Sequence, residues 1–239
     1  MNLLELQGVH THIGAYHILH GVDLAVPKGQ LTMLLGRNGA GKTTTLRTIM
    51  GLWHASAGTV RFGGKDIAAM HTPQIAELGI AYVPESMGIF SDLTVKENML
   101  LAARSAKNAA QIDDTRLKWI FKLFPAVEKF WNHPAGKLSG GQKQMLAVSR
   151  AIVEPRELLL IDEPSKGLAP AIINNMIDAF AELKASGVTI LLVEQNLNFA
   201  QRLGDTVAVM DNGRVVHSGG MAAFSADAQL QQSLLGLAL

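Results

Sequence analysis

One stretch of the chain constrains its fold more than any other. It runs Gly36-Arg37-Asn38-Gly39-Ala40-Gly41-Lys42-Thr43-Thr44 and satisfies the phosphate-loop pattern G-x-x-x-x-G-K-[ST]. The apolar run at 31–35 predicts a buried strand before this loop, and residues 45–50 predict a helix after it. A strand, a glycine-rich loop and a helix in this order are the setting that a phosphate-binding loop requires, which disfavours an accidental glycine-rich turn.

The residue types in this loop suit the binding of phosphate. Gly36, Gly39 and Gly41 have no Cβ, so the backbone can turn tightly and bring its N–H groups against phosphate oxygens. The helix that follows directs the positive end of its dipole into the same space. Lys42 would carry a mobile charge to the β- and γ-phosphates, and the Thr43 hydroxyl would bind Mg²⁺. The loop therefore predicts a nucleoside triphosphate and Mg²⁺ as cofactors, with Lys42 also acting in catalysis.

The pattern of apolar runs predicts an α/β fold with a mostly parallel sheet. Residues 158–161 and 188–193 are continuous apolar runs, which are typical of central parallel strands covered on both faces. Shorter strands at 22–26 and 59–62, each followed by a turn that contains glycine, predict a small antiparallel β-subdomain beside the phosphate loop.

The middle of the chain has a different character. Residues 86–137 place apolar residues at helical spacing and contain no apolar strand run, so we expect an inserted helical subdomain. The prediction is one domain over 1–239, in which 1–85 and 138–239 form the nucleotide-binding core with its β-subdomain.

The composition limits the classes to which the protein can belong. Its 239 residues, 48% of them hydrophobic, are ample for one large α/β domain. The sequence has no cysteine, which excludes disulfides and thiolate metal sites, and its net charge of +1 argues against a large nucleic-acid surface. It shows neither a signal peptide nor an apolar run of ~20 residues, so we expect a cytoplasmic protein.

Two carboxylates end the apolar run at 158–161. Asp162 and Glu163 follow it directly. In a phosphate-loop fold such a strand lies beside the loop, so Asp162 can reach the Mg²⁺ shell. Glu163 can polarise the water that attacks the γ-phosphate, as a general base or a water-positioning group. An acidic strand end alone is a weak signal, but the phosphate loop in the same chain favours the catalytic interpretation.

The segment Leu138-Ser139-Gly140-Gly141-Gln142 carries the most specific signal. It suits a helix start that Ser139 caps, and it is also the signature of ATP-binding-cassette (ABC) ATPases, letter for letter. From about Leu3 to Gly220 the chain resembles an ABC transporter ATPase subunit. In that family the capped helix faces the γ-phosphate held by the other subunit. The resemblance implies ATP as the nucleotide and two chains packed head to tail, with four residues of this segment as nucleotide ligands: Ser139, Gly140, Gly141 and Gln142.

Three further segments narrow the resemblance to the LivF-type ATPases of branched-chain amino-acid importers. They are Tyr82-Val83-Pro84-Glu85, Leu168-Ala169-Pro170 and Leu192-Val193-Glu194-Gln195-Asn196. The resemblance implies ATP hydrolysis that drives separate membrane permeases, with the chain peripheral on the inner face of the cell membrane. It also implies a second ABC ATPase subunit, either LivG-like or another copy, and indirectly a periplasmic solute-binding protein.

Other functions stay open at this stage. Urea and amide importers have similar ATPases, so the solute is not defined. A non-transport ABC ATPase is a weaker alternative, because family members acting on DNA carry long coiled coils and those acting on ribosomes usually carry two cassettes. A phosphate-loop kinase is disfavoured, since kinases do not need the segment 138–142.

The chain departs from the general family pattern at several positions. Glu85 stands where glutamine is usual in the loop that senses the permease, and a carboxylate there can still lie near Mg²⁺ or the attacking water. Gln195 stands at the switch position where histidine is usual, and Ala169 where aspartate is frequent. These three match the LivF-like pattern, so Glu85 is a candidate nucleotide and metal ligand and Gln195 a candidate catalytic residue. Lys166 replaces an uncharged residue, and we expect it to be a solvated loop lysine.

The residues that would contact adenine are less defined. Ile13 stands where family members tend to have an aromatic residue on which the base stacks. Tyr16, which we favour, or His12 or His17 can supply a ring instead, or Ile13 can give apolar contact alone. The resemblance also implies a groove for a permease helix along residues 85–105. Phe90 and Leu93 would line this groove, unless they pack internally.

Overall fold

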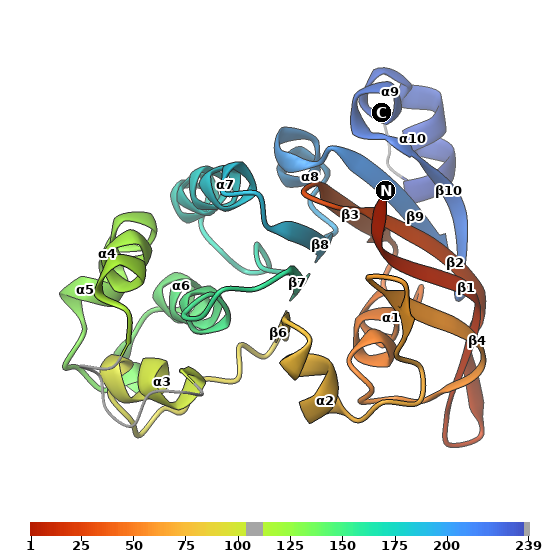
Figure 1. The fold of residues 1–239 in the computed structure, drawn as a ribbon. Coiled ribbons are helices and arrows are strands. Elements are labelled where there is room, and N and C mark those ends of the chain that lie inside the picture. Colours follow the sequence, from red (N-terminus) through yellow and green to blue (C-terminus); the bar gives the residue numbers. More distant parts are fainter. Residues whose placement is uncertain (104–111, 237–239) are drawn as a thin grey trace.

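A six-stranded sheet with strand order β10-β9-β3-β8-β7-β6 forms the centre of the fold (Figure 1). The structure is a computed structural model that describes residues 1–103 and 112–236. The parallel strands are β3 (Leu31–Gly36), β6 (Ile80–Val83), β7 (Leu158–Asp162), β8 (Thr189–Val193) and β9 (Thr206–Asp211). The last strand, β10 (Arg214–Gly220), is antiparallel to β9. The mostly parallel sheet confirms the fold class expected from the sequence.

A second, antiparallel sheet has the order β2-β1-β4-β5 and lies on the right of Figure 1. Its strands are β1 (Asn2–Ile13), β2 (Tyr16–Pro27), β4 (Ala55–Phe62) and β5 (Lys65–Asp66). In β2, Val22, Leu24 and Val26 are buried while the residues between them are exposed, as the alternation in the sequence requires. The predicted antiparallel β-subdomain is therefore present.

The central strands are buried on both faces, which explains their continuous apolar runs. In β7, Leu159 and Ile161 belong to a hydrophobic cluster on the helical side of the sheet. Leu158 and Leu160 belong to the cluster that the antiparallel sheet shares. Strand β7 thus joins the two hydrophobic cores and holds its carboxyl end rigidly in place.

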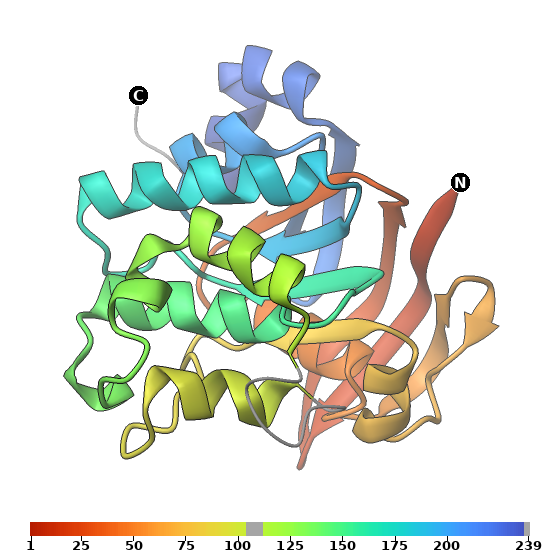
Figure 2. The same cartoon turned by 60° about the vertical axis from the view of Figure 1, so that its left-hand side comes forward.

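The helices divide between these two cores. The first, α1 (Lys42–Ile49), lies between the two sheets, and α2 (Thr72–Glu77) follows β5. Most of the others gather on the opposite face of the central sheet, as Figures 1 and 2 show. They are α3 (Val95–Ala102), α4 (Asp114–Leu123), α5 (Pro125–Lys129), α6 (Gly140–Ala151), α7 (Pro170–Ala185) and α8 (Leu197–Leu203).

The segment predicted to be a helical insertion is helical where it is described. Within 86–103 and 112–137 it contains α3, α4, α5 and a short 3₁₀ helix, and its only strand pairing is the isolated bridge between Thr94 and Pro134. Two C-terminal helices, α9 (Met221–Ala226) and α10 (Ala228–Leu235), were not predicted from the sequence. No helix in the described ranges is long and apolar enough to cross a membrane.

Candidate nucleotide-binding site

The phosphate loop connects β3 to α1 through three glycines with positive φ. Their φ angles are 147° at Gly36, 81° at Gly39 and 104° at Gly41. A Cβ on Gly36 would collide with the carbonyl oxygen of Met210, and one on Gly41 would lie 2.9 Å from Leu19 Cδ2. Glycine is therefore required at both positions for the conformation and for the space.

Lys42 is held inside this loop, although it is a lysine. Its side chain is buried, and Nζ donates to the carbonyl oxygens of Gly36 (2.8 Å) and Arg37 (3.1 Å). Nζ also lies 3.8 Å from Glu163 Oε1. Burial lowers the pKa of Lys42, and the nearby Glu163 and Asp162 carboxylates oppose that shift. The loop thus holds a poorly solvated cation, which a phosphate anion would stabilise.

Thr43 and Asp162 meet as a magnesium site requires. The Thr43 hydroxyl donates to Asp162 Oδ1 over 3.1 Å, and the Tyr82 hydroxyl donates to Oδ2 over 3.3 Å. Asp162 is fully buried, and this burial raises its pKa, while the hydrogen bond from Thr43 opposes the rise. A desolvated carboxylate beside a hydroxyl oxygen fits Mg²⁺, which takes oxygen ligands and completes its shell with water and nucleotide phosphates.

The metal would depend on the nucleotide for much of its shell. In the described part of the chain no group of three or more His, Asp or Glu side chains is arranged to hold a metal ion. Glu85 makes no hydrogen bond to Thr43 or Asp162 in that part, and its carboxylate accepts one from Lys166 instead. The metal-binding role of Glu85 therefore stays a prediction.

Gln195 joins the phosphate loop to the candidate catalytic glutamate. Its Nε2 donates to Glu163 Oε1 over 2.6 Å and to Asn38 Oδ1 over 2.8 Å. Glu163 is 8% exposed and adopts φ = 47°, a conformation that non-glycine residues rarely take. Such backbone strain is frequent at functional sites. The structure thus brings together three residues that the sequence analysis selected separately.

A buried carboxylate that the sequence analysis used only as a subfamily mark fixes this arrangement. Glu194 accepts hydrogen bonds from the backbone N–H groups of Ser165 (2.9 Å), Gln195 (3.1 Å) and Asn196 (3.2 Å). Burial raises the pKa of Glu194, and these hydrogen bonds oppose the rise. Glu194 therefore ties the turn that carries Gln195 to the loop that follows Glu163.

Lys166 is exposed, as expected, and also has carboxylate partners. The sequence analysis favoured a solvated loop lysine, and the side chain is indeed 56% exposed. However, its Nζ lies 2.6 Å from Glu85 Oε1 and 3.4 Å from Glu163 Oε2. These carboxylates raise the pKa of Lys166, the hydrogen bond to Glu85 most strongly. The expectation of a solvated loop lysine therefore agrees with the structure, but the sequence did not predict its two carboxylate partners, because Glu85 lies in a loop distant in sequence.

The start of α6 confirms the capping interpretation of the ABC signature. Gln142 N donates to Ser139 Oγ over 3.4 Å, and Ser139 N donates to Gln142 Oε1 over 2.9 Å. A Cβ on Gly141 would lie 2.7 Å from Ile172 Cγ2, so this glycine allows α6 to lie close to α7. Ser139 and Gly140 are exposed. Among the described residues, none of 139–142 hydrogen-bonds to the phosphate loop, so their role toward a nucleotide stays a prediction.

A cavity of about 420 Å³ opens beside the phosphate loop. Its lining includes Gly36 and Asn38 of the loop and Glu194 and Gln195 from the turn after β8. Leu235 of the unpredicted helix α10 also lines it. The side chains of Asn38, Glu194 and Gln195 thus share one space next to the loop.

The residues proposed for adenine lie at the tip of the β1–β2 hairpin. Ile13 is half-buried and Tyr16 is 76% exposed. His12 and His17 stack on each other, with ring centroids 4.1 Å apart and planes 11° apart, so each ring covers one face of the other. No contact distinguishes these candidates, and the adenine-binding roles of Ile13 and Tyr16 stay predictions.

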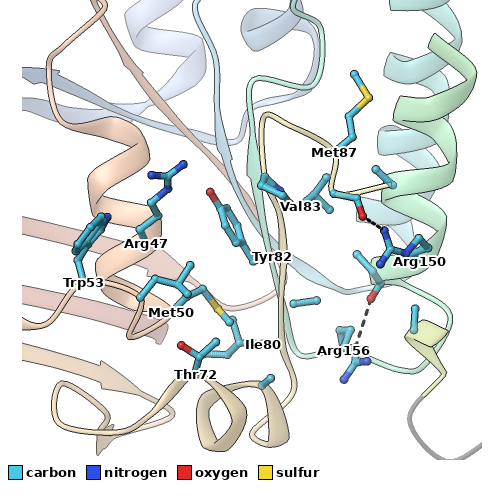
Figure 3. Close-up of a pocket in the computed structure, with 18 residues that line it drawn as sticks. Arg47, Met50, Trp53, Thr72, Ile80, Tyr82, Val83, Met87, Arg150 and Arg156 are labelled. Carbon is cyan, nitrogen blue, oxygen red and sulfur yellow. Dashed lines mark hydrogen bonds between the residues drawn. The ribbon is translucent and has the colours of Figure 1, made fainter. Parts of the chain in front are cut away.

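A larger groove of about 730 Å³ lies on another part of the surface (Figure 3). Figure 3 shows Arg47 and Trp53 on one side of it, Met87 and Arg150 on the other, and Tyr82 between them. Phe90 and Leu93, which we expected to line a permease groove, are not among its lining residues, so their role toward a permease stays a prediction. Phe90 is 50% exposed and lies under the Arg150 guanidinium, 5.3 Å from ring centroid to Cζ.

These features define the class of protein. A parallel sheet that places a phosphate loop, a buried aspartate and an oriented glutamate around one space is the arrangement of a phosphate-loop ATPase. The particular family follows from comparison with known proteins. A family model described as "ABC transporter" matches residues 19–166, and the chain belongs to that family.

Relatives agree with this assignment over nearly the whole chain. The "High-affinity branched-chain amino acid transport ATP-binding protein BraG" of Pseudomonas aeruginosa is 38% identical over 98% of this chain and 100% of its own. A probable LivF from Archaeoglobus fulgidus is 36% identical over 85% of this chain and 86% of its own. An ABC transporter cassette crystallised in its ADP conformation superposes with a TM-score of 0.82 at 27% identity, covering 97% and 98% of the two chains. The chain is therefore an ABC-type ATPase.

Proposed function

We propose that this chain is the ATP-hydrolysing subunit of an importer for branched-chain amino acids. The observation that carries the proposal is the network of Lys42, Glu163 and Gln195 beside the phosphate loop, in a chain matched over 98% of its length by BraG. Solute contacts would lie in other subunits, so the solute class rests on the relatives named above.

The geometry supports a distinct role for each residue of the site. Loop N–H groups and Lys42 would bind the β- and γ-phosphates, and Thr43 and Asp162 would hold Mg²⁺, which would neutralise phosphate charge. Glu163 orients a water in line with the γ-phosphate and receives its proton, while Gln195 holds Glu163 Oε1 in place. The attacking water oxygen bonds to the γ-phosphorus as the bond to the β-phosphate oxygen breaks, giving ADP and phosphate.

A second ABC ATPase chain would complete the site. The exposed N-terminus of α6 offers N–H groups and the Ser139 hydroxyl to an anion outside this chain. We propose that it faces the γ-phosphate bound by a LivG-like partner or another copy, packed head to tail. The chain would thus contribute its phosphate loop to one site and its α6 to the other.

The groove of Figure 3 is the proposed docking site for a permease helix. It is lined by apolar residues such as Met50, Trp53 and Met87, with arginines at its sides. It lies between the proposed core, 1–85 and 138–239, and the proposed helical subdomain, 86–137. Docking there would place the chain on the cytoplasmic face of the membrane, with a periplasmic solute-binding protein acting on the permeases from the other side.

Reconstitution tests this function. The chain, its candidate partner ATPase and the permeases are placed in proteoliposomes, with the solute-binding protein and labelled leucine, isoleucine or valine on the periplasmic face. We expect ATP-dependent transport that Glu163→Gln abolishes. Transport of urea or amides in place of these amino acids would reassign the solute, and ATP hydrolysis without any transport would contradict the importer function.

A further inference from the structure

The ammonium of Lys166 lies between two carboxylates from separate parts of the chain. One is Glu85, at 2.6 Å, in the loop after β6, and the other is Glu163, at 3.4 Å, at the end of β7. The Glu85 loop borders the groove, because Pro84 and Met87 on either side of Glu85 line it. Lys166 thus connects the wall of the groove to the catalytic carboxylate.

The two oxygens of Glu163 are held from different sides. Oε1 accepts the hydrogen bond from Gln195 and lies 3.8 Å from the Lys42 ammonium. Oε2 lies 3.4 Å from Lys166, and the described residues give this oxygen no other hydrogen bond or ion pair. The orientation of the carboxylate plane therefore depends on Lys166 as well as on Gln195.

The Glu85 loop is also attached to α6 and is itself strained. Arg150 Nη1 of α6 donates to Gly88 O over 2.5 Å. Met87 adopts φ = 63°, which is unfavourable for a residue with a side chain. The loop is thus held by β6 at one end and by Arg150 at the other, and its backbone strain is of a kind found at switch regions.

We propose that Lys166 is a positioning residue that transmits the state of the groove to Glu163. Displacement of the Glu85 loop by a docked helix moves the Lys166 ammonium, and with it the orientation of the water-activating carboxylate. The inference rests on the proposed function for the docking event. The bridge itself rests on the two distances from the Lys166 ammonium to Glu85 and Glu163. Because the Lys166 side chain is 56% exposed, its ammonium has room to move with Glu85.

The test is a double-mutant cycle measured on the reconstituted transporter and on the associated ATPase chains without permeases. The variants are Lys166→Leu, Lys166→Arg, Glu85→Gln and the Lys166→Leu/Glu85→Gln pair. Lys122→Leu is the matched control, since Lys122 is an exposed lysine paired with Glu182 at 2.9 Å, away from the site. Lys166→Gln replaces Lys166→Leu if the apolar side chain lowers the yield of folded protein.

We expect Lys166→Leu to lower kcat about tenfold with little change in KM for ATP, because it removes an orienting contact outside the phosphate loop. Stimulation of the ATPase by permeases and solute should be lost, Lys166→Arg should restore most of both, and Lys122→Leu should resemble wild type. The double variant should be no slower than the slower single variant, since both cut the same bridge.

The proposal would be overturned if the losses of kcat in Lys166→Leu and Glu85→Gln multiplied in the double variant, because the two residues would then act independently. A Lys166→Leu enzyme that keeps the kcat and the stimulation of wild type would also overturn it. A structural role alone would shift the melting temperature and leave the ratio of stimulated to basal rate unchanged. If the wild-type complex shows no stimulation at all, the importer function fails, while the kcat cycle on the associated ATPase chains without permeases still tests the bridge.

Discussion

The chain has two helix N-termini of interest for a nucleotide, and they differ in what surrounds them. The loop before α1 is connected to its own chain through Lys42, through Thr43 on Asp162 and through Asn38 on Gln195. The start of α6 is exposed at Ser139 and Gly140, and its capping box joins Ser139 to Gln142 within the same turn. Both helix starts can bind anions, but the first has a buried lysine, Lys42, next to the candidate catalytic residue Glu163. The difference fits the proposal that one chain binds ATP and that a pair of chains hydrolyses it.

Removing the charge at the α1 site should have the largest effect. Lys42→Ala is expected to lower the ATPase rate of the assembled pair by about a thousandfold or more and to weaken ATP binding, because the main cation for the γ-phosphate is lost. Turnover and nucleotide titrations measure both effects. Lys28→Ala is the control, since Lys28 forms only a distant exposed pair with Glu157. Normal turnover in Lys42→Ala would show that this loop is not the active one.

The next largest effect should come from Gln195, which joins Asn38 of the phosphate loop to Glu163. Gln195→Ala is expected to lower kcat by about a hundredfold, since a donor that orients Glu163 is lost. Gln195→His should introduce or steepen an acid limb between about pH 6 and 7, because imidazole titrates there and an amide does not. The pH–rate profiles are compared between variants, because the chain has 8 other titratable histidines. A Gln195→Ala enzyme as fast as wild type would remove the switch role.

A smaller loss of hydrolysis should show that the start of α6 has a different role from the start of α1. Ser139→Ala is expected to lower hydrolysis by the assembled pair about tenfold, while ATP binding by the single chain stays the same. Thr94→Ala is the matched control, because Thr94 caps α3 with the same type of capping box and faces no proposed nucleotide. Equal losses of ATP hydrolysis in Ser139→Ala and Thr94→Ala would show that Ser139 acts only as a helix cap.

The smallest effect concerns the link from the groove to Asp162. Burial and the Asp162 carboxylate raise the pKa of Tyr82 to about 12, so its hydroxyl is a donor at any working pH. Tyr82→Phe keeps the ring and removes the donor, and we expect the Mg²⁺ concentration for half-maximal rate to rise about threefold. Mn²⁺ binding in the presence of a non-hydrolysable ATP analogue gives a second measurement. An unchanged metal dependence would limit Tyr82 to packing in the groove.

Asp162 also links function to stability. Because burial raises its pKa, the folded chain holds this proton more tightly than the unfolded chain does, so Asp162 lowers stability as the pH rises through its folded pKa. Asp162→Asn should therefore raise the melting temperature at pH 7 by about 2 °C or more and lose this advantage below the pKa of an ordinary carboxyl. Calorimetry at both pH values measures this, and a lower melting temperature at pH 7 would contradict it.

The sequence predicted most of what depends on short segments. Apolar runs located the central strands, and motifs selected Lys42, Asp162, Glu163 and Gln195, which the structure brings together. It missed contacts between segments far apart: Tyr82 and Asp162 are 80 positions apart, and Glu85 and Lys166 are 81. Such pairs depend on strand order and loop geometry, which periodicity does not contain. The C-terminal helix α10 was also missed. None of its residues is fully buried.

The central claim is that one chain binds ATP and two chains hydrolyse it. The most direct measurement is the specific ATPase activity of the isolated chain against its concentration, with its mass followed by light scattering and ATP binding by calorimetry. At concentrations where the 25.6 kDa monomer prevails, we expect ATP binding at one per chain with almost no hydrolysis. Hydrolysis should appear only as chains associate or when a partner ATPase is added. A specific activity that stays constant on dilution into the monomer range would contradict the account.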